Sequence, residues 1–414
     1  MKSVYNNIGN CYWGAGRYIM KILITTDAFT PLVNGVVTST INLYKQLKEH
    51  GHDVKILTLA HGGASRKEDD VYYIRSFGVN IYPNARATVL FRDHLIKEII
   101  EWKPDVIHSQ TEFCSFLFAR KIARKLDIPV VHTYHTLYQD YTGYFTKHEH
   151  IGQKLVIGFS KTLLNHVDGV IVPTEKTKRI LEGYGIKEEI QVVPNGIELD
   201  AFKKQITIEE KNALKESLGI DLSYRVLVTV GRLGIEKNID ELLEGMKLYL
   251  NKRQDITLVI VGDGPHKKAL EEQAREMGIE KHIVFTGMIN PKEIYKYYQL
   301  GEVFISASSS ETQGLTYIEA LADGIPIVCK KDECLMGVLK DGYNGYMFTS
   351  IDEMVQRIDE LLEDQKLYEE IKENTTVSVE EFNSELFGER IEDIYMQVVH
   401  QTEEEEQKRS FLIG

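Results

Sequence analysis

The chain has 414 residues, of which 43% are hydrophobic and 27% are charged, an ordinary composition for a globular protein. No apolar run approaches the ~20 residues that a membrane-spanning helix needs, so the sequence predicts no bilayer crossing. The net charge of −13 is unevenly divided: residues 1–190 carry 24 basic and 19 acidic residues (+5), and residues 191–414 carry 25 and 43 (−18). This charge distribution argues against extended nucleic-acid binding and allows the first half to approach an anionic lipid surface. Chance variation between two solvated surfaces explains the split equally well.

The length suggests two domains of roughly 200 residues each, with a cleft between them. The four cysteines, Cys11, Cys114, Cys329 and Cys334, have neither the spacing of a disulfide framework nor that of a zinc site, which indicates a reducing cytoplasm. Residues 1–19 lack the apolar core of a signal peptide, and a buried-strand pattern begins directly after Met20. Met20 is therefore an alternative start, and residues 1–19 are either native or an added extension.

Short apolar runs alternate with segments of helical periodicity along the whole chain. The first series of predicted strands comprises residues 21–26, 53–60, 105–110, 129–135, 169–174 and 190–196, and the second comprises 225–233, 256–264, 282–287, 303–308 and 325–330. Runs that are apolar along their full length predict parallel strands buried on both faces. The predicted fold class is α/β, with two doubly wound Rossmann-like domains whose ligand sites lie at the carboxyl ends of the strands.

A polar stretch at about 197–224 separates the two series and predicts the domain boundary. We expect an amino-terminal domain at 20–196 and a carboxyl-terminal domain at 197–383. A helical pattern near 384–400 follows. The acidic segment 401–414, with the run TEEEE, predicts a frayed, solvated tail.

In the second series, the loop GRLGIEKN follows a predicted strand and places Arg232 and Lys237 at its two ends, just before a helix. Two cations beside the N–H groups of a helix start can receive a diphosphate; two exposed cations on an ordinary loop are the alternative. VGDGP at 261–265 is a weaker signal, because a lone Gly-x-Gly after a strand is more typical of a tight turn.

In the first series, Gly35 precedes a helix after the loop TDAFTPLVN, and a glycine there lets backbone N–H groups approach an anion. A plain strand-to-helix connection is the alternative. His132 and His135 end another predicted strand and are expected to face the cleft, where they contact substrate or serve a structural role.

The stretch SSETQGLTYIEALADGIPIV carries two glutamates after a predicted strand. Glu311 lies on the loop, Gly314 permits a close turn, and Leu315 or Thr316 begins a helix that carries Glu319. One glutamate precedes the helix and the other lies within it, so they cannot form a catalytic pair on one helical face. An anion fits at the helix start between them, and carboxylates on either side suit hydroxyl groups, as in the two sugars of a sugar nucleotide.

Together, the E-x7-E pair with Gly314, the run ALADGIPIV at 320–328, GRLxxxK at 231–237 and VGDGP resemble the retaining glycosyltransferases of family 4, whose fold is called GT-B. The likeness extends from about residue 21 to 400. It implies that the second domain binds the nucleotide and the first the acceptor, and that the last helix returns to the first domain.

Carried over by resemblance, Arg232 and Lys237 would bind the diphosphate, with Gly35 approaching it from the other side and Gly314, Leu315 and Thr316 at the helix start. Glu319 would hold the ribose, and Met288 would lie where the family's backbone holds the base. Glu311 would contact the transferred sugar, and His135 would lie near the reacting centre. The catalytic set is therefore Glu311, His135, Lys237 and Arg232. The chain has no Asp-x-Asp, so we expect neither a metal ion nor another cofactor besides the UDP-sugar donor.

The family usually has an aromatic residue between Glu311 and Gly314, where this chain has Gln313. ETQGLT and HTYHTLYQDY resemble the bacterial subgroup that glucosylates diacylglycerol, which implies a lipid acceptor. Residues 85–103 and 153–167 are apolar, cation-bearing stretches that suit an anionic membrane surface or, alternatively, are core helices.

The sequence thus predicts a cytoplasmic enzyme, peripheral to the membrane, that transfers a hexose, glucose from UDP-glucose in the preferred interpretation, to diacylglycerol with retention. The alternatives are a polyprenol-linked or soluble glycan acceptor, and a UDP-sugar-binding protein without activity. The sequence does not distinguish a glucose from a galactose donor, or diacylglycerol from an already glycosylated lipid.

Overall fold

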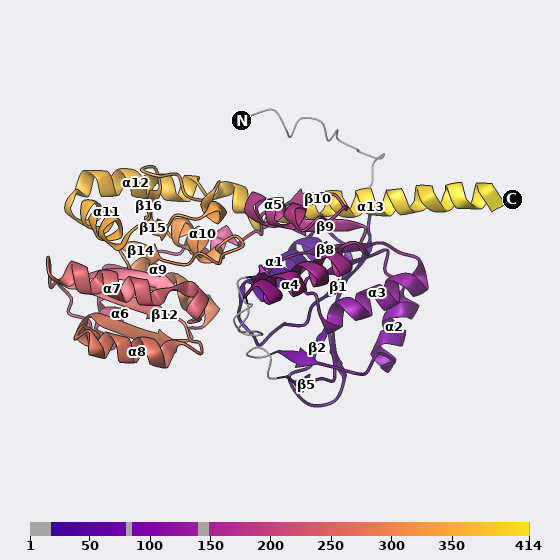
Figure 1. Ribbon diagram of the computed structural model, residues 1–414, viewed down its shortest axis with the longest axis horizontal. Coiled ribbons are helices and arrows are strands. Elements are labelled where there is room, and N and C mark those ends of the chain that lie inside the picture. Colours follow the sequence, from indigo (N-terminus) through magenta and orange to yellow (C-terminus); the bar gives the residue numbers. More distant parts are fainter. Residues whose placement is uncertain (1–17, 80–84, 140–148, 414) are drawn as a thin grey trace.

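The computed structural model describes residues 18–79, 85–139 and 149–413 and divides into two lobes that lie side by side (Figure 1). Residues 1–17 of the predicted extension, and residues 140–141 of the HTYHTLYQDY stretch, lie outside the described residues. The first lobe is built on a sheet of order β10-β9-β8-β7-β1-β2-β4-β3, parallel except for the β3–β4 pair. Its strands are β1 (Lys21–Thr25), β2 (Asp53–Leu59), β3 (Arg66–Glu68), β4 (Val71–Ile74), β7 (Val106–Ser109), β8 (Val130–Thr133), β9 (Gly169–Val172) and β10 (Ile190–Val192), and β5 (Phe77–Gly78) pairs separately with β6 (Arg86–Ala87).

The second lobe contains an all-parallel sheet of order β13-β12-β11-β14-β15-β16. The strands are β11 (Arg225–Val230), β12 (Ile256–Val261), β13 (Ile283–Gly287), β14 (Val303–Ser306), β15 (Ile327–Lys330) and β16 (Gly345–Phe348). Every residue of β12 and β14 is buried, as the apolar runs predict for strands covered on both faces. Two doubly wound α/β domains are therefore confirmed.

Helices cover the faces of both sheets (Figure 1). In the first lobe they are α1 (Gly35–Glu49), α2 (His94–Trp102), α3 (Cys114–Leu126), α4 (Glu149–Leu164) and α5 (Glu175–Gly183). In the second they are α6 (Ile208–Ser217), α7 (Ile239–Leu250), α8 (Lys267–Glu276), α9 (Ile294–Leu300), α10 (Leu315–Ala322), α11 (Ile351–Glu363) and α12 (Gln365–Val377), and α13 (Ser384–Ile413) closes the chain. Short 3-10 turns include η3 (Ile235–Lys237) and η6 (Glu333–Leu335).

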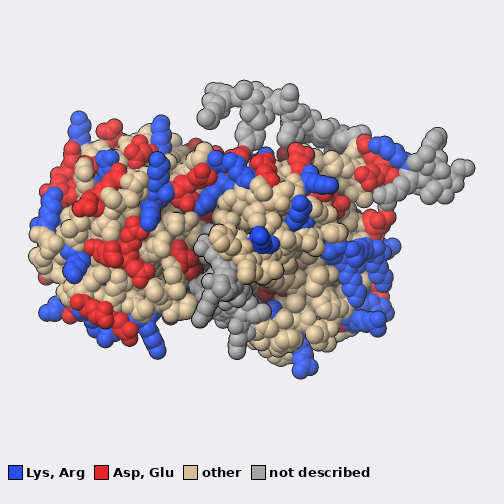
Figure 2. Space-filling view, in the orientation of Figure 1, with Lys and Arg blue, Asp and Glu red and all other residues tan. Residues whose placement is uncertain are grey.

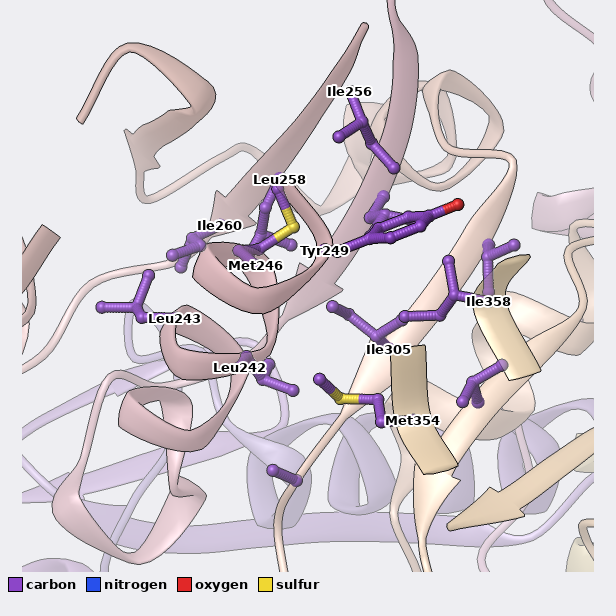
Figure 3. Close-up of a cluster of buried hydrophobic side chains, with 14 of the residues drawn as sticks. Leu242, Leu243, Met246, Tyr249, Ile256, Leu258, Ile260, Ile305, Met354 and Ile358 are labelled. Carbon is purple, nitrogen blue, oxygen red and sulfur yellow. The ribbon is translucent and has the colours of Figure 1, made fainter. Parts of the chain in front are cut away.

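The core of the second lobe lies between its sheet and the α7–α11 pair. Leu242, Met246 and Tyr249 of α7 pack on Leu258 of β12, and Met354 reaches them from α11 (Figure 3). A Cβ added at Gly245 would lie 1.9 Å from the Met354 methyl carbon, so the glycine permits this close approach of the helices. The buried sheet and its helices form a firm base for the loops at the strand ends.

The chain passes between the lobes at two adjacent segments. After β10, Ile197 donates its N–H to the Phe382 carbonyl (2.8 Å) and accepts from the N–H of Ser384 (3.0 Å). From there α13 runs back along the first lobe, where Tyr395 is hydrogen-bonded to His108 of β7 (2.6 Å) (Figure 1). We propose this double crossing as the domain boundary, next to the predicted position at 196/197.

Two sequence expectations differ from the structure. The segment 197–224 is not simply polar: it contains α6, and its Phe202 and Ile220 are buried in the core of the second lobe. α13 continues through Ile413, where we expected a frayed tail; Glu404 lies 3.4 Å from His400 and 3.5 Å from Lys408, and charge pairs at i,i+4 stabilise a helix.

Candidate active site

Two loops at neighbouring strand ends of the second lobe are joined by an ion pair. Strands β11 and β14 are adjacent, so the GRLGIEKN loop after β11 lies beside the SSETQG loop after β14. Lys237 Nζ lies 2.5 Å from Glu311 Oε1, and the Ser310 hydroxyl donates to the Glu236 carbonyl (3.1 Å). The structure thus brings together Lys237 and Glu311, which the sequence places 74 residues apart.

The charge on Glu311 is maintained in a mostly buried position. Its side chain is 17% exposed. Burial alone would raise the pKa of Glu311, but the charge of Lys237, its hydrogen bond to the carboxylate and the charge of Lys176 hold that pKa below its ordinary value. Glu311 is therefore an ionised carboxylate at neutral pH, which can accept hydrogen bonds from hydroxyl groups.

Arg232 lies at the other end of the same loop, with Nη1 3.6 Å from Glu236 Oε1. The VGDGP stretch supports this loop: a Cβ at Gly262 would lie 1.9 Å from the Gly231 carbonyl oxygen, and one at Gly264 would lie 2.4 Å from the Leu233 carbonyl oxygen. The glycines therefore allow two loops to pack closely, which is the tight-turn interpretation of that motif.

The start of α10 requires a glycine at position 314. Gly314 has φ +74°, a conformation that favours glycine, and a Cβ there would lie 2.4 Å from the Tyr317 ring. α10 begins at Leu315, so the N–H groups of Leu315 and Thr316 belong to its first turn, which carries partial positive charge.

The start of α1 in the first lobe lies opposite the start of α10. α1 begins at Gly35, with Asn34 as its N-cap. A Cβ at Gly35 would lie 3.8 Å from Leu315 Cδ1, so the two helix starts approach each other between the lobes. Two helix starts, together with Arg232 and Lys237 on the adjoining loop, can attract an anion, with Glu236 and Glu311 offsetting part of the charge of the two cations.

Glu319 lies one helical turn after Leu315, the first residue of α10, and its hydrogen-bond partner differs from that of Glu311. The Tyr298 hydroxyl donates to its Oε2 (2.6 Å). Burial raises the pKa of Glu319 to about 7, and the hydrogen bond from Tyr298 offsets only part of that shift. The two glutamates therefore occupy separate environments, as their predicted placement on a loop and within a helix implies.

The two strand-end histidines of the first lobe differ from each other. His135 Nε2 is hydrogen-bonded to Gln110 Oε1 (2.7 Å), and burial together with nearby His132 lowers the pKa of His135 to about 3. His135 is therefore a neutral imidazole. Because the Gln110 side-chain oxygen can only accept a hydrogen bond, His135 Nε2 carries the proton and its Nδ1 is free to act as an acceptor. The expectation that His132 faces the cleft is wrong: it is fully buried, packs edge-on against Phe116 and lies 3.4 Å from Glu112.

Met288 follows β13, three strand positions from β14. It is 57% exposed and is not part of the loop cluster around Glu311.

Within residues 18–79, 85–139 and 149–413, no three His, Cys, Asp or Glu side chains are grouped so that they could hold a metal ion. None of the described helices is both long enough and apolar enough to span a membrane.

Sequence reasoning missed the residues of the first lobe that hold the Glu311 loop. Gln313 is buried and bonds to Asn195: its Oε1 accepts from the Asn195 backbone and side-chain N–H groups (both 2.8 Å), and its Nε2 donates to the Asn195 carbonyl (3.0 Å). Gln313 therefore lies between the lobes and joins the Glu311 loop to the first lobe. Lys176, at the start of α5, also reaches this loop.

The two parallel-sheet domains, which meet at their strand-end loops, have the architecture of the GT-B fold. The Anabaena protein HepE, solved in complex with UDP and glucose, has this fold and superposes with a TM-score of 0.73 at 17% identity, covering 91% of this chain and 100% of that one. The sequence matches two family models, Glycosyltransferase Family 4 over residues 33–201 and Glycosyl transferases group 1 over 210–377.

Two relatives match over nearly the whole chain. The alpha-monoglucosyldiacylglycerol synthase of Streptococcus pneumoniae is 35% identical over 92% of this chain and 86% of its own length. The protein of the same name from Acholeplasma laidlawii is 32% identical over 92% of this chain and 98% of its own length. The chain belongs to glycosyltransferase family 4, as the resemblance of its motifs implies.

Proposed function

We propose that this enzyme transfers glucose from UDP-glucose to diacylglycerol with retention of anomeric configuration. The observation that carries the proposal is the similarity, at 35% and 32% identity and over nearly the full chain, to two alpha-monoglucosyldiacylglycerol synthases. The site residues support the same chemistry, and an exposed apolar surface on the first lobe supports a lipid acceptor.

In this proposal the donor lies along the strand ends of the second lobe. The base contacts the backbone at Met288 after β13, the diphosphate lies between Arg232, Lys237 and the start of α10, and the hexose meets Glu311 after β14. From β13 to β14 is three strand spacings, roughly 14 Å, which leaves room for an extended nucleotide sugar. Glu319 accepts hydrogen bonds from the ribose hydroxyls.

Arg232, Lys237 and the starts of α1 and α10 stabilise the negative charge that develops on the leaving diphosphate, in place of a metal ion. The bond between the hexose C1 and the phosphate oxygen breaks, and a bond to the acceptor oxygen forms on the same face. The acceptor hydroxyl proton passes to the departing phosphate oxygen. Glu311 positions the hexose through its hydroxyls, and the neutral His135 accepts a hydrogen bond from the sugar at Nδ1.

The acceptor surface that we propose is an apolar patch on α3 and α4. Ile151, Leu155 and Phe159 are 56%, 66% and 41% exposed and recur every four residues along one face of α4. Phe113, at the start of α3, stacks on Phe159 with ring centroids 6.1 Å apart, and Leu117 follows one turn later. Large apolar side chains exposed together are typical of an interaction surface rather than a core.

Cations lie beside this apolar patch. Lys154 and Lys161 are exposed on α4, and Lys121, Arg124 and Lys125 are exposed on α3. Figure 2 shows basic side chains gathered at the end of the first lobe over α2 and α3, whereas charges of both signs are mixed on the second lobe. An apolar surface flanked by cations suits an anionic lipid surface, so we propose a peripheral position on the cytoplasmic face of the membrane.

Of the two stretches expected to meet the membrane, only one exposes large apolar side chains on a helix. In 153–167, Leu155 and Phe159 are exposed, whereas Leu163, Leu164 and Val167 are buried in the core. In 85–103, by contrast, Leu95, Ile96 and Ile99 of α2 face the core, which is the alternative that the sequence left open. The exposed large apolar residues of this stretch are Val89 and Leu90, ahead of the helix.

The proposal is tested by supplying UDP-glucose or UDP-galactose, radiolabelled in the hexose, with anionic vesicles that contain or lack diacylglycerol. We expect label in the lipid phase only with UDP-glucose and diacylglycerol together. Transfer without lipid would favour a soluble acceptor, transfer only to an added polyprenol carrier would favour that acceptor, and binding of UDP-glucose with no product would favour a non-catalytic protein.

A further inference from the structure

The loop that carries Glu311 is held by the opposite lobe at three successive residues. The Glu311 carbonyl accepts from Lys176 Nζ (3.3 Å), the Thr312 carbonyl accepts from the Thr174 hydroxyl (2.8 Å), and the Gln313 side chain bonds to Asn195. Asn195 is in turn held in the first lobe by the Ser39 hydroxyl, which donates to its Oδ1 (2.7 Å). The position of this loop therefore depends on contact between the lobes.

Lys176 also forms an ion pair with Asp332 of the second lobe. Its Nζ lies 2.7 and 2.9 Å from the two carboxylate oxygens of Asp332 and 3.3 Å from the carbonyl of Ser309, in addition to the Glu311 carbonyl. The side chains of Lys176 and Asp332 are 11% and 12% exposed, so the pair is shielded from water. Removing one member of such a pair leaves a charge without its partner and is costly.

The contacts of Lys176, Thr174 and Asn195 with the second lobe all cross the interface between the lobes. The Glu311 side chain is fixed by Lys237 from its own lobe, and the Glu311 main chain is fixed by Lys176 from the other. When the lobes separate, Lys237 stays with Glu311 and Lys176 does not. The complete set of contacts around Glu311 therefore exists only while the lobes are together.

We propose that Lys176 is a positioning residue that couples closure of the lobes to the placement of Glu311. This inference rests on the proposed function, because it takes Glu311 as the carboxylate that contacts the transferred sugar. The donor binds to the second lobe before closure, and Lys176 then fixes the Glu311 loop for the transfer step. Removal of Lys176 should accordingly slow turnover and leave UDP affinity nearly unchanged.

Arg179 supplies a matched control on the same helix. It pairs with Glu333, the neighbour of Asp332, across the same interface, with Nη2 to Oε2 at 3.0 Å. The two side chains are 52% and 60% exposed, and Arg179 directs its hydrogen bonds to Glu175, Glu333 and Met336 instead of to the Glu311 loop. Exposed pairs of this kind contribute little to stability.

The experiment compares Lys176→Met, Lys176→Arg and Arg179→Met with the wild type. For Lys176→Met we expect kcat to fall by about tenfold or more with the UDP dissociation constant, measured by calorimetry, within about threefold. Lys176→Arg keeps a cation that can reach Asp332 and should recover most of the activity, and Arg179→Met should stay within about twofold of wild type. If Lys176→Met does not fold, Asp332→Asn removes the same ion pair from the other lobe and should also lower kcat selectively.

Small-angle scattering with UDP-glucose and no acceptor separates this inference from the proposed function. The wild type and Arg179→Met should become more compact on donor binding, and Lys176→Met should do so less. The scattering result does not depend on which acceptor is used, so a failure to glucosylate diacylglycerol would leave it interpretable. Equal kcat and equal compaction in Lys176→Met and Arg179→Met, or a loss confined to UDP affinity, would overturn the inference.

Discussion

Lys237 Nζ and Glu311 Oε1, 2.5 Å apart, join the loop after β11 to the loop after β14 at the interface between the lobes. One partner is a cation proposed for the diphosphate, and the other is a carboxylate proposed for the hexose. An ammonium has three donors, so Lys237 can hold Glu311 and a phosphate oxygen at the same time. In the proposed arrangement, the pair thus links the contacts to the diphosphate with the contacts to the hexose.

Replacing Glu311 with alanine should reduce kcat by about 100-fold or more, because the hexose loses the carboxylate that positions it at the reacting centre. UDP affinity, measured by calorimetry, should change by no more than about threefold, since Glu311 contacts the hexose and not the nucleotide. Near-normal turnover in Glu311→Ala would remove this residue from the site.

Arg232→Ala and Lys237→Ala should each raise the UDP dissociation constant by about tenfold or more, because each removes a charge-assisted contact with the diphosphate. Lys237→Ala should in addition lower kcat, since it also releases Glu311. The control is Lys247→Ala, which removes an exposed lysine from α7 on the same lobe. Unchanged UDP affinity in both site variants would place the diphosphate elsewhere.

UDP-glucose affinity should fall as the pH falls below about 7. Burial raises the pKa of Glu319 to about 7, so below that pH the carboxyl is increasingly protonated and loses its capacity to accept from both ribose hydroxyls. Because donor binding then requires loss of this proton, the dissociation constant should rise by up to about tenfold per pH unit in this range.

Glu319→Gln separates this effect from other titrations. Asp323, whose pKa burial raises to about 8, is retained in the variant, whereas the pKa values of Glu311 and His135 lie too low for either group to titrate near pH 7. We expect Glu319→Gln to bind UDP-glucose more weakly and with little pH dependence between pH 5.5 and 7.5. A pH dependence equal to that of the wild type would assign the titration to another group.

Leu155→Glu should weaken binding to anionic vesicles by about tenfold or more in a sedimentation assay, because it places a carboxylate in the apolar face of α4. Leu222→Glu makes the same change at a 46% exposed leucine of the second lobe and should have little effect. Equal binding by the two variants would mean that another surface meets the membrane.

The fold could be predicted from the sequence because buried parallel strands are apolar along their whole length. β3, by contrast, is an exposed edge strand of Arg66, Lys67 and Glu68, so no apolar run marks it. The charge of the acidic run alone predicts a solvated tail. The pairs of Glu404 with His400 and Lys408, four residues away on either side, explain why α13 continues as a helix.

The candidate site was predictable wherever the residues follow one another along the second lobe. Glu311 and Glu319 were correctly assigned to a loop and a helix, because the predicted helix begins between them. Lys176 and Asn195 could not be found in this way, because their contacts with residues 311 and 313 depend on how the two lobes meet. The burial of His132 likewise depends on packing against Phe116, which strand-end position does not reveal.

The most direct test of the central claim is the anomeric configuration of the lipid product. UDP-glucose labelled with carbon-13 at C1 is incubated with the wild-type enzyme and diacylglycerol vesicles, and the extracted lipid is examined by nuclear magnetic resonance. We predict an α-linked glucosyl diacylglycerol, because the donor is α-linked and transfer occurs on the same face. A β-linked product would contradict retention, and the absence of labelled lipid would contradict diacylglycerol as the acceptor.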